Sequence, residues 1–156
     1  MTSAAEVVVI GAGQSGLAAA RALQARGISP VVLEAGDRAA GSWPCYYDSL
    51  KAFSPAGFNS MPGMAFPGDP DHYPARDEVA GYLDSYAAAL GVEIRTRTRV
   101  TAVGKDDRDF VVVTADGRRL RAAGIVAATV TLARGASSLA TCAAPPSVQS
   151  AADRRH

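Results

Sequence analysis

The sequence lacks the features that mark membrane, disulfide-rich and nucleic-acid-binding proteins. It has no run approaching the roughly 18 apolar residues of a membrane span, and no basic segment precedes its first apolar run, so we expect no secretory signal and a cytoplasmic location. Its two cysteines, Cys45 and Cys142, lie far apart without metal-type spacing and are predicted to be reduced thiols. Because 16 basic and 15 acidic side chains leave a net charge of +1, we expect no nucleic-acid partner.

The length of 156 residues favours one domain. A compact chain of this size buries roughly 70% of the surface that its unfolded form exposes, which suffices for one core but not for two. Regular patterning extends over residues 1–129, whereas residues 130–156 follow neither a strand nor a helix period. We therefore predict a domain at 1–129 and a tail at 130–156 that is disordered or translated out of frame.

The first part of the chain has the pattern of a β-α-β unit. In residues 6–10, Glu6 is followed by four apolar, β-branched residues, which is typical of a strand covered on both faces in a parallel sheet. An Ala-rich helix is predicted over residues 14–26, and a second buried strand over 31–33. The predicted fold class is therefore α/β, with a parallel sheet and a right-handed crossover.

A long irregular segment and a second helix follow. Residues 35–74 are rich in proline and glycine but also carry aromatic side chains, so we expect an ordered loop that packs. Residues 76–90 have apolar side chains at steps of three and four, two acidic residues in the first turn and Gly91 after the end, which predicts a helix. Further strands are expected at 92–95, 99–103, 109–114, 120–121 (a hairpin partner) and 124–129.

A phosphate-binding pattern lies between the first strand and the first helix. It is a G-x-G-x-x-G motif, called the glycine loop below, formed by Gly11, Ala12, Gly13, Gln14, Ser15 and Gly16. Gly11 would permit a tight turn, Gly13 would let the backbone approach a pyrophosphate, and Gly16 would let helix and strand pack closely. The N–H groups at the helix N-terminus would then bind the diphosphate without a lysine.

Glu34 ends the second strand about twenty residues after the glycine loop, and it completes a dinucleotide-binding fingerprint. Its carboxylate can accept two hydrogen bonds from an adenosine ribose and would repel a 2′-phosphate, which disfavours NADP at this site. Because FAD and NAD share this fingerprint, the motif alone leaves both open. A glycine-rich turn beside a surface glutamate is the structural alternative.

Several motifs follow Glu34 in a fixed order. They are Gly41-Ser42-Trp43, Tyr47-Asp48-Ser49-Leu50, Met61-Pro62-Gly63-Met64 with Phe66-Pro67-Gly68, and Tyr73-Pro74 with Arg76-Asp77-Glu78 and Tyr82-Leu83. Over about residues 6–129, this series resembles the N-terminal part of flavin-containing monooxygenase-like FAD/NAD(P) oxidoreductases, with Baeyer-Villiger-type monooxygenases as wider relatives. The resemblance implies a Rossmann-like FAD-binding fold with a small β-meander, incomplete at its C-terminus.

The resemblance also implies where the cofactor would lie. Gly41, Ser42 and Trp43 would run along the flavin, and Val100 would contact adenine through its backbone. Thr129 would return to the cofactor, although Val130 stands where the family has a glycine that allows close backbone approach.

Further predictions concern one aspartate, two histidines and a set of alternating arginines. Asp48 could lie near the flavin or simply form a turn, and His72 and His156 are expected to face solvent. The alternation of Arg95, Arg97 and Arg99 predicts one exposed face of a strand.

The function implied by the resemblance is FAD-dependent oxidation, with NADPH as the reductant and O2 as the oxidant. The family's second glycine motif, for NADPH, is not found in this sequence, so we expect an N-terminal fragment that is inactive as an isolated chain. The alternatives are a non-catalytic FAD- or NAD-binding module and a truncated product without function. The sequence predicts neither the substrate nor a catalytic residue.

Overall fold

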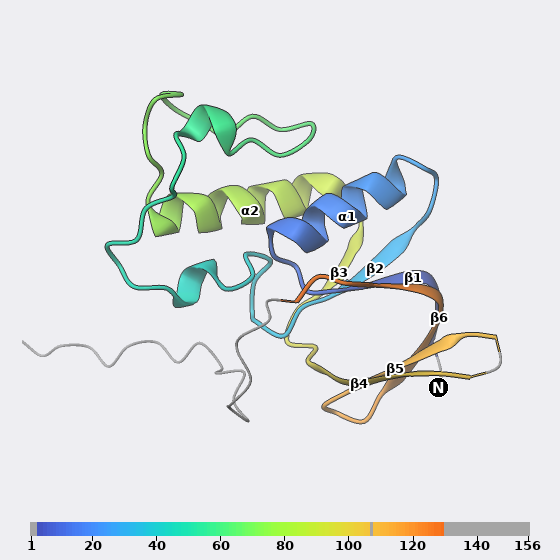
Figure 1. Cartoon of the computed structure of the whole chain (residues 1–156). Helices are drawn as coiled ribbons and strands as arrows, with labels where there is room; N and C mark the ends of the chain where they lie inside the picture. The colour runs from blue at the N-terminus through green and yellow to red at the C-terminus, as the bar shows by residue number, and fades with distance from the viewer. Residues whose placement is uncertain (1–2, 107, 130–156) are drawn as a thin grey trace, which may run out of the picture.

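The computed structural model describes residues 3–106 and 108–129 (Figure 1). The elements in these ranges are, in chain order, β1 (Ser3–Ile10), α1 (Gln14–Gln24), β2 (Pro30–Leu33), the short 3₁₀ helices η1 (Trp43–Cys45) and η2 (Ala56–Phe58), α2 (Arg76–Leu90), β3 (Glu93–Arg95), β4 (Val100–Lys105), β5 (Phe110–Thr114) and β6 (Arg119–Ala127). Residues 130–156, with the predictions made for Val130, Cys142 and His156, lie outside the described residues.

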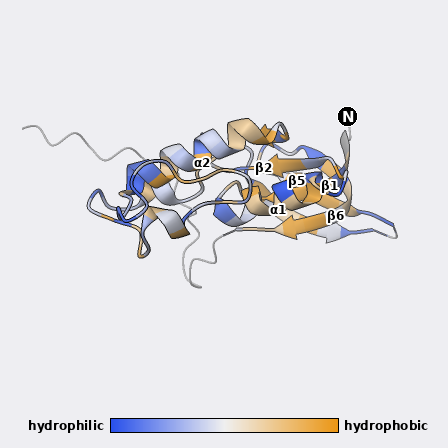
Figure 2. Cartoon of the chain, turned by 90° about the horizontal axis from the view of Figure 1, so that it is seen from above, coloured by the Kyte–Doolittle hydropathy of each residue, from blue (hydrophilic) through white to orange (hydrophobic). Residues whose placement is uncertain are grey.

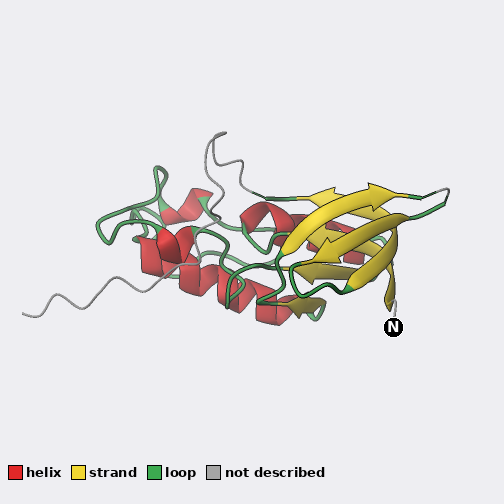
Figure 3. Ribbon diagram, turned by 90° about the horizontal axis from the view of Figure 1, so that it is seen from below, coloured by secondary structure: helices red, strands yellow, loops and turns green. Residues whose placement is uncertain are grey.

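The strands form one sheet in the order β3-β2-β1-β6-β5-β4. Strand β1 pairs in parallel with β2 and β6, and β2 pairs in parallel with β3. Strands β4, β5 and β6 are joined by antiparallel pairing, so a small meander extends the parallel part (Figure 3). This topology confirms the Rossmann-like α/β fold with a β-meander.

The central position of β1 explains its continuous apolar sequence. Val9 is fully buried in a cluster with Leu17 of α1 and Leu83 of α2. Its neighbour Val8, also fully buried, packs in a second cluster with Val112 of β5. Because successive side chains of a strand point to opposite faces, a strand covered on both sides needs apolar residues at every position. The hydrophobic colouring of the sheet in Figure 2 reflects this double coverage.

Helix α2 matches the predicted range of 76–90 and lies beside α1 in Figure 1. It buries Val79, Leu83, Tyr86 and Leu90, the residues whose spacing predicted it. The helix ends at Gly91, which adopts a left-handed conformation with φ 66°. Among the described residues, no helix has the length and apolar character needed to cross a membrane.

Two strand predictions are wrong. The segments expected at 120–121 and 124–129 are one strand, β6, because its first half pairs with β5 while its whole length pairs with β1. The arginine alternation does not lie on one strand, because the chain turns between β3 and β4, where Arg97 has a φ of 51°. The turn is fixed by the Thr98 N–H, which donates to the Glu34 carbonyl at 2.8 Å.

The long segment 35–74 is ordered, but its aromatic side chains pack less than expected. Phe66 is buried and stacks against Tyr82 of α2, with ring centroids 4.6 Å apart. Phe53 and Phe58 are instead 99% and 84% exposed, so their packing was predicted wrongly. Backbone hydrogen bonds provide much of the order, including those from Ala52 to Pro74 and from Ala56 to His72.

Candidate functional site

The glycine loop begins with a turn that only glycine fits. Gly11 has a φ of 102°, and a Cβ placed on it would lie 2.8 Å from the Ala128 carbonyl oxygen. Its N–H donates to the Leu33 carbonyl at 2.8 Å, while the Ala128 N–H donates to the Ile10 carbonyl at 2.9 Å. The loop is therefore held between the C-terminal ends of β2 and β6.

Gly16 has a packing role. A Cβ at this position would lie 1.9 Å from the Gly11 carbonyl oxygen, which real structures do not allow. The first turn of α1 can therefore lie directly on the glycine loop, as the sequence pattern predicts.

Gly13 has room for a small side chain in the protein itself. The nearest atom to a Cβ built on it is the Gly41 Cα, at an ordinary contact distance of 3.6 Å. Gly13 is also the N-cap of α1, and no side chain caps the helix there. Since the first N–H groups of a helix lack intrahelical partners, this end can bind an anion. The side chains of Gln14 and Ser15, in the first turn, are exposed beside it.

Glu34 is 8% exposed and braces the glycine loop. Its Oε2 accepts a hydrogen bond from the Ala12 N–H at 2.7 Å, and its Oε1 accepts one from the Gly36 N–H at 2.7 Å. Each carboxylate oxygen keeps a further lone pair for a ribose hydroxyl. The sequence pattern predicts only the ribose role of Glu34 and gives no sign of its bond to the loop.

Residues 41–43 lie against the glycine loop. Gly41 has a φ of 56°, and a Cβ on it would lie 2.7 Å from the Gly13 Cα. Ser42 is the N-cap of η1, and Trp43 is the first residue of η1. The structure therefore brings two motifs together that are well separated in the sequence.

A small hollow adjoins this contact. It is lined by side chains of α1, η1, α2 and the loop between η2 and α2, including Gln14, Trp43, Met61, Phe66, Tyr82 and Leu83. A larger hollow, of about 260 Å³, lies on the meander near Lys105, Arg119 and Arg121. Because β6 pairs Leu120 with Ser3, the larger hollow is at the opposite end of the sheet from the glycine loop.

The other two residues predicted to contact the cofactor, Thr129 and Val100, lie near the glycine loop and near the end of β2. Thr129 is exposed, and its backbone nitrogen lies 3.5 Å from the position of a Cβ on Gly11. Val100 begins β4 and packs against the second apolar cluster, which includes Ile10 and Leu33. Val100 therefore belongs to the same cluster as Leu33, the last residue of β2 and the neighbour of Glu34.

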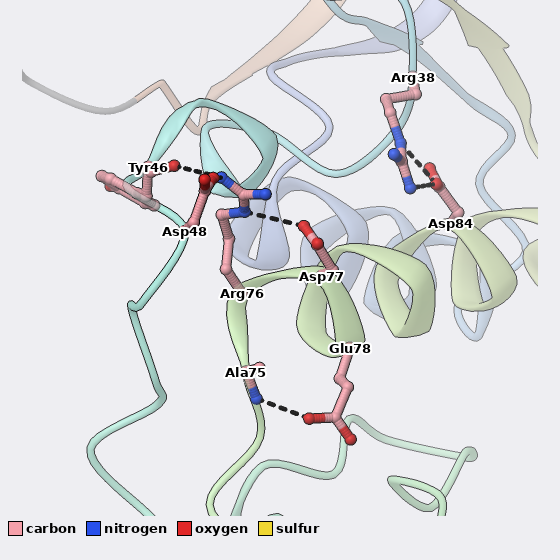
Figure 4. A network of polar contacts seen from close by, with 8 residues as sticks. All are labelled: Arg38, Tyr46, Asp48, Ala75, Arg76, Asp77, Glu78 and Asp84. Carbon is pink, nitrogen blue, oxygen red and sulfur yellow. Dashed lines mark hydrogen bonds and ion pairs between the residues drawn. The ribbon is translucent and has the colours of Figure 1, made fainter. Parts of the chain in front are cut away.

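A polar network that the sequence pattern does not reveal lies at the start of α2 (Figure 4). Arg76 Nη1 donates to the Tyr46 carbonyl at 2.7 Å and to Asp48 Oδ1 at 2.5 Å, and its Nε donates to Asp77 Oδ1 at 2.8 Å. The bond from Arg76 holds the pKa of Asp77 below its ordinary value. Asp48 is therefore a partner of Arg76, and this contact favours a structural role for Asp48 over a position near the flavin.

His72 has a partner at the same end of α2. Its Nε2 lies 3.0 Å from Glu78 Oε2, and that oxygen also accepts the Ala75 N–H at 2.8 Å. The hydrogen bond from His72, and then that from Ala75, lower the pKa of Glu78. The His72 side chain is 44% exposed, in agreement with the solvent-facing position expected for it.

Comparisons with known proteins agree with this geometry. The sequence model of the pyridine nucleotide-disulphide oxidoreductase family matches residues 8–133. An uncharacterized oxidoreductase, CzcO-like, of Geobacillus kaustophilus is 39% identical over 78% of this chain and 35% of its own length. The structure of a flavin-containing monooxygenase from Stenotrophomonas maltophilia superposes with a TM-score of 0.76 and 39% identity, over 82% of this chain and 39% of that one. Indole-3-pyruvate monooxygenase YUCCA1 of Oryza sativa is 44% identical over 56% of this chain and 22% of its own.

Proposed function

Because the chain belongs to the pyridine nucleotide-disulphide oxidoreductase family, we propose that it binds FAD and serves as the FAD-binding part of a monooxygenase-like oxidoreductase. The observation that carries the proposal is the meeting of the glycine loop, Glu34 and residues 41–43 at the C-terminal ends of β1 and β2. Ligands of open α/β sheets bind at this edge.

Each part of the site has a proposed role. The glycine loop would bind the pyrophosphate through the N–H groups of its backbone, with open space at Gly13 for close approach. Glu34 would accept hydrogen bonds from the adenosine ribose. The backbone of Val100 would contact the adenine. Residues 41–43 would lie along the flavin ring, and Thr129 would close the site beside Gly11.

FAD is favoured over NADP by charge and by neighbouring residues. The carboxylate of Glu34 would repel the 2′-phosphate of NADP, whereas FAD has a free ribose there. Residues 41–43 lie beside the proposed pyrophosphate position, so they could contact the part of FAD that extends beyond the pyrophosphate. When bound, the flavin would supply hydride acceptance and oxygen chemistry, and the protein would supply orientation and exclusion of water.

The monooxygenase activity, with NADPH as co-substrate, is a proposal about a larger unit. The chain spans 35% of the length of the oxidoreductase from Geobacillus and 39% of the monooxygenase from Stenotrophomonas. We propose that residues 1–129 form its FAD-binding domain and that the protein works in the cytoplasm. A dinucleotide-binding module without turnover is the second candidate, and it rests on the same glycine loop and Glu34.

The test uses the visible absorbance of flavin. The purified chain is mixed with FAD, freed of unbound FAD by gel filtration, and then mixed with NADPH without oxygen. Co-eluting flavin supports the proposed binding, and its absence contradicts it. Bleaching of the bound flavin faster than that of free FAD would show a nicotinamide site, whereas no acceleration is the result expected of a binding module.

A further inference from the structure

Helix α2 holds both ends of the segment that contains residues 41–43. At one end, the Arg38 guanidinium forms an ion pair with Asp84, with its Nε 2.7 Å from Oδ2. At the other end, Arg76 binds the Tyr46 carbonyl and Asp48 (Figure 4). Residues 41–43, which would face the flavin, therefore lie between two contacts that the chain makes with α2: Arg38 with Asp84, and Tyr46 with Arg76.

Of the two arginines, Arg76 is better placed to fix the position of the segment that contains residues 41–43. Its side chain is 17% exposed, whereas that of Arg38 is 44% exposed. An exposed ion pair contributes little, but an arginine side chain that is mostly covered and also donates to a backbone carbonyl restrains the chain itself. The backbone N–H of Arg76 adds a bond to the Leu50 carbonyl at 2.9 Å, so the segment after Tyr46 is held at two points.

The restraint extends from Tyr46 to Trp43. The Tyr46 N–H donates to the Trp43 carbonyl at 3.2 Å, which closes η1. The two rings also contact edge to face, with centroids 5.8 Å apart and planes at 84°. Tyr46 is therefore the residue through which Arg76 acts on Trp43, while Gly41 at the start of the turn rests on Gly13.

We propose that Arg76 is a positioning residue for the flavin-ring side of the cofactor site, acting through Tyr46 on residues 41–43. This inference rests on the proposed FAD binding for its effect on the cofactor, but its effect on Trp43 is a property of the free protein. Arg76 makes no described contact with the glycine loop. Loss of Arg76 therefore loosens the flavin-ring side and leaves the adenosine diphosphate side unchanged.

Trp43 is the only tryptophan of the chain, so its fluorescence reports on this turn alone. The test compares the wild-type chain with Arg76→Gln in two measurements: acrylamide quenching of Trp43 without ligand, and affinities for FAD and for ADP. The matched control is Arg121→Gln, since Arg121 also bridges two carboxylates, Asp106 and Asp109, but on the meander.

The expected result for Arg76→Gln is stronger quenching of Trp43 and about tenfold weaker binding of FAD, the scale of one charge-assisted hydrogen bond, with unchanged binding of ADP. Arg121→Gln should change none of these. Wild-type values for Trp43 quenching and for the FAD-to-ADP affinity ratio in Arg76→Gln would overturn the proposal. An equal loss of both ligands would also overturn it, because it would indicate a general structural role.

Two more variants keep the test decisive if Arg76→Gln folds poorly. Asp48→Asn removes the negative charge of a side chain that is 88% exposed, so it should preserve the fold and shift Trp43 quenching and FAD affinity in the same direction by less. Arg76→Lys keeps the charge but loses the fork that spans three acceptors, and it should restore the wild-type values only in part. If the wild-type chain bound neither FAD nor ADP, the proposed function would fail, while the quenching of Trp43 would still decide the role of Arg76.

Discussion

Gly13 and Gly41 touch through their backbones. A Cβ on Gly41 would lie 2.7 Å from the Gly13 Cα, so the two segments can approach this closely only because Gly41 has no side chain. The contact joins the open N-terminus of α1 to the turn that leads into Trp43. The uncapped N-terminus of α1 therefore lies on one side of this contact and Trp43 follows it on the other.

Substitution of Gly41 by alanine should cost more stability than substitution of Gly91. Both residues have positive φ, 56° and 66°, but a Cβ on Gly91 would meet nothing within 4 Å. Gly91→Ala should lose about 1 kcal/mol from left-handed strain alone, and Gly41→Ala about 2–4 kcal/mol, since the contact with Gly13 must also open. Urea denaturation measures both variants, and equal losses would show that the close approach is unimportant.

Alanine should have opposite effects at Gly13 and Gly16. Gly13→Ala places its Cβ in ordinary contact with the Gly41 Cα, at 3.6 Å, and should keep the wild-type free energy of unfolding within about 1 kcal/mol, the scale of an N-cap change, yet weaken ADP and FAD binding by at least about tenfold. Gly16→Ala should lose about 2–4 kcal/mol of stability because its Cβ overlaps the Gly11 carbonyl. Calorimetric titration and chemical denaturation separate the two effects, and tight binding by Gly13→Ala would contradict the assigned pyrophosphate position.

Glu34→Ala should reduce both stability and binding. The variant leaves the N–H groups of Ala12 and Gly36 without their carboxylate, and we expect a loss of about 2–4 kcal/mol in the free energy of unfolding. ADP binding should weaken by about 1.5–3 kcal/mol because the ribose loses its acceptor. Glu34→Gln keeps one acceptor oxygen, so its stability and its ADP affinity should lie between those of the wild type and those of Glu34→Ala. A stability equal to that of the wild type would show that Glu34 does not brace the glycine loop.

The stabilising effect of Glu78 should disappear in acid. Because its pKa is lowered in the folded protein, its contribution is complete above the ordinary glutamate pKa and is lost as the pH falls through the folded pKa. Glu78→Gln should therefore be less stable than the wild type at pH 7, by about 0.5–1 kcal/mol since its side chain is 49% exposed, and nearly equal to it below about pH 3.

Urea denaturation at both pH values tests this prediction. The control is Glu6→Gln, because in the part of the chain that the structure describes the Glu6 carboxylate accepts a single long hydrogen bond, 3.4 Å from the Ser29 N–H. A difference between Glu78→Gln and the wild type that is as large at low pH as at pH 7 would contradict the assigned cause.

Features set by neighbouring residues were predictable from the sequence. The glycine loop, the strand before it and the helix of residues 76–90 each follow from a local pattern, and the structure has all three. Features that depend on contacts between residues far apart in the sequence were not predictable. The continuity of β6 depends on β1 and β5 together, and Arg76 finds Tyr46 only after the long segment has folded against α2.

The exposure of the loop aromatics shows the same limit. Phe66 and Phe58 occur in the same stretch of sequence, yet Phe66 stacks on Tyr82 while Phe58 is exposed. Composition predicts that aromatic residues favour burial, but it does not say which of them meets a partner. The tight contact of Gly41 with Gly13 was likewise invisible, although the resemblance placed both residues along the same cofactor.

The most direct test of the proposed function is a calorimetric titration of the full chain with FAD, repeated in the presence of saturating ADP and with Gly13→Ala. The account predicts saturable binding at one site, competition by ADP, and loss of binding in a variant that keeps its stability. No binding of FAD by the folded wild-type chain, or equal binding by Gly13→Ala, would contradict it.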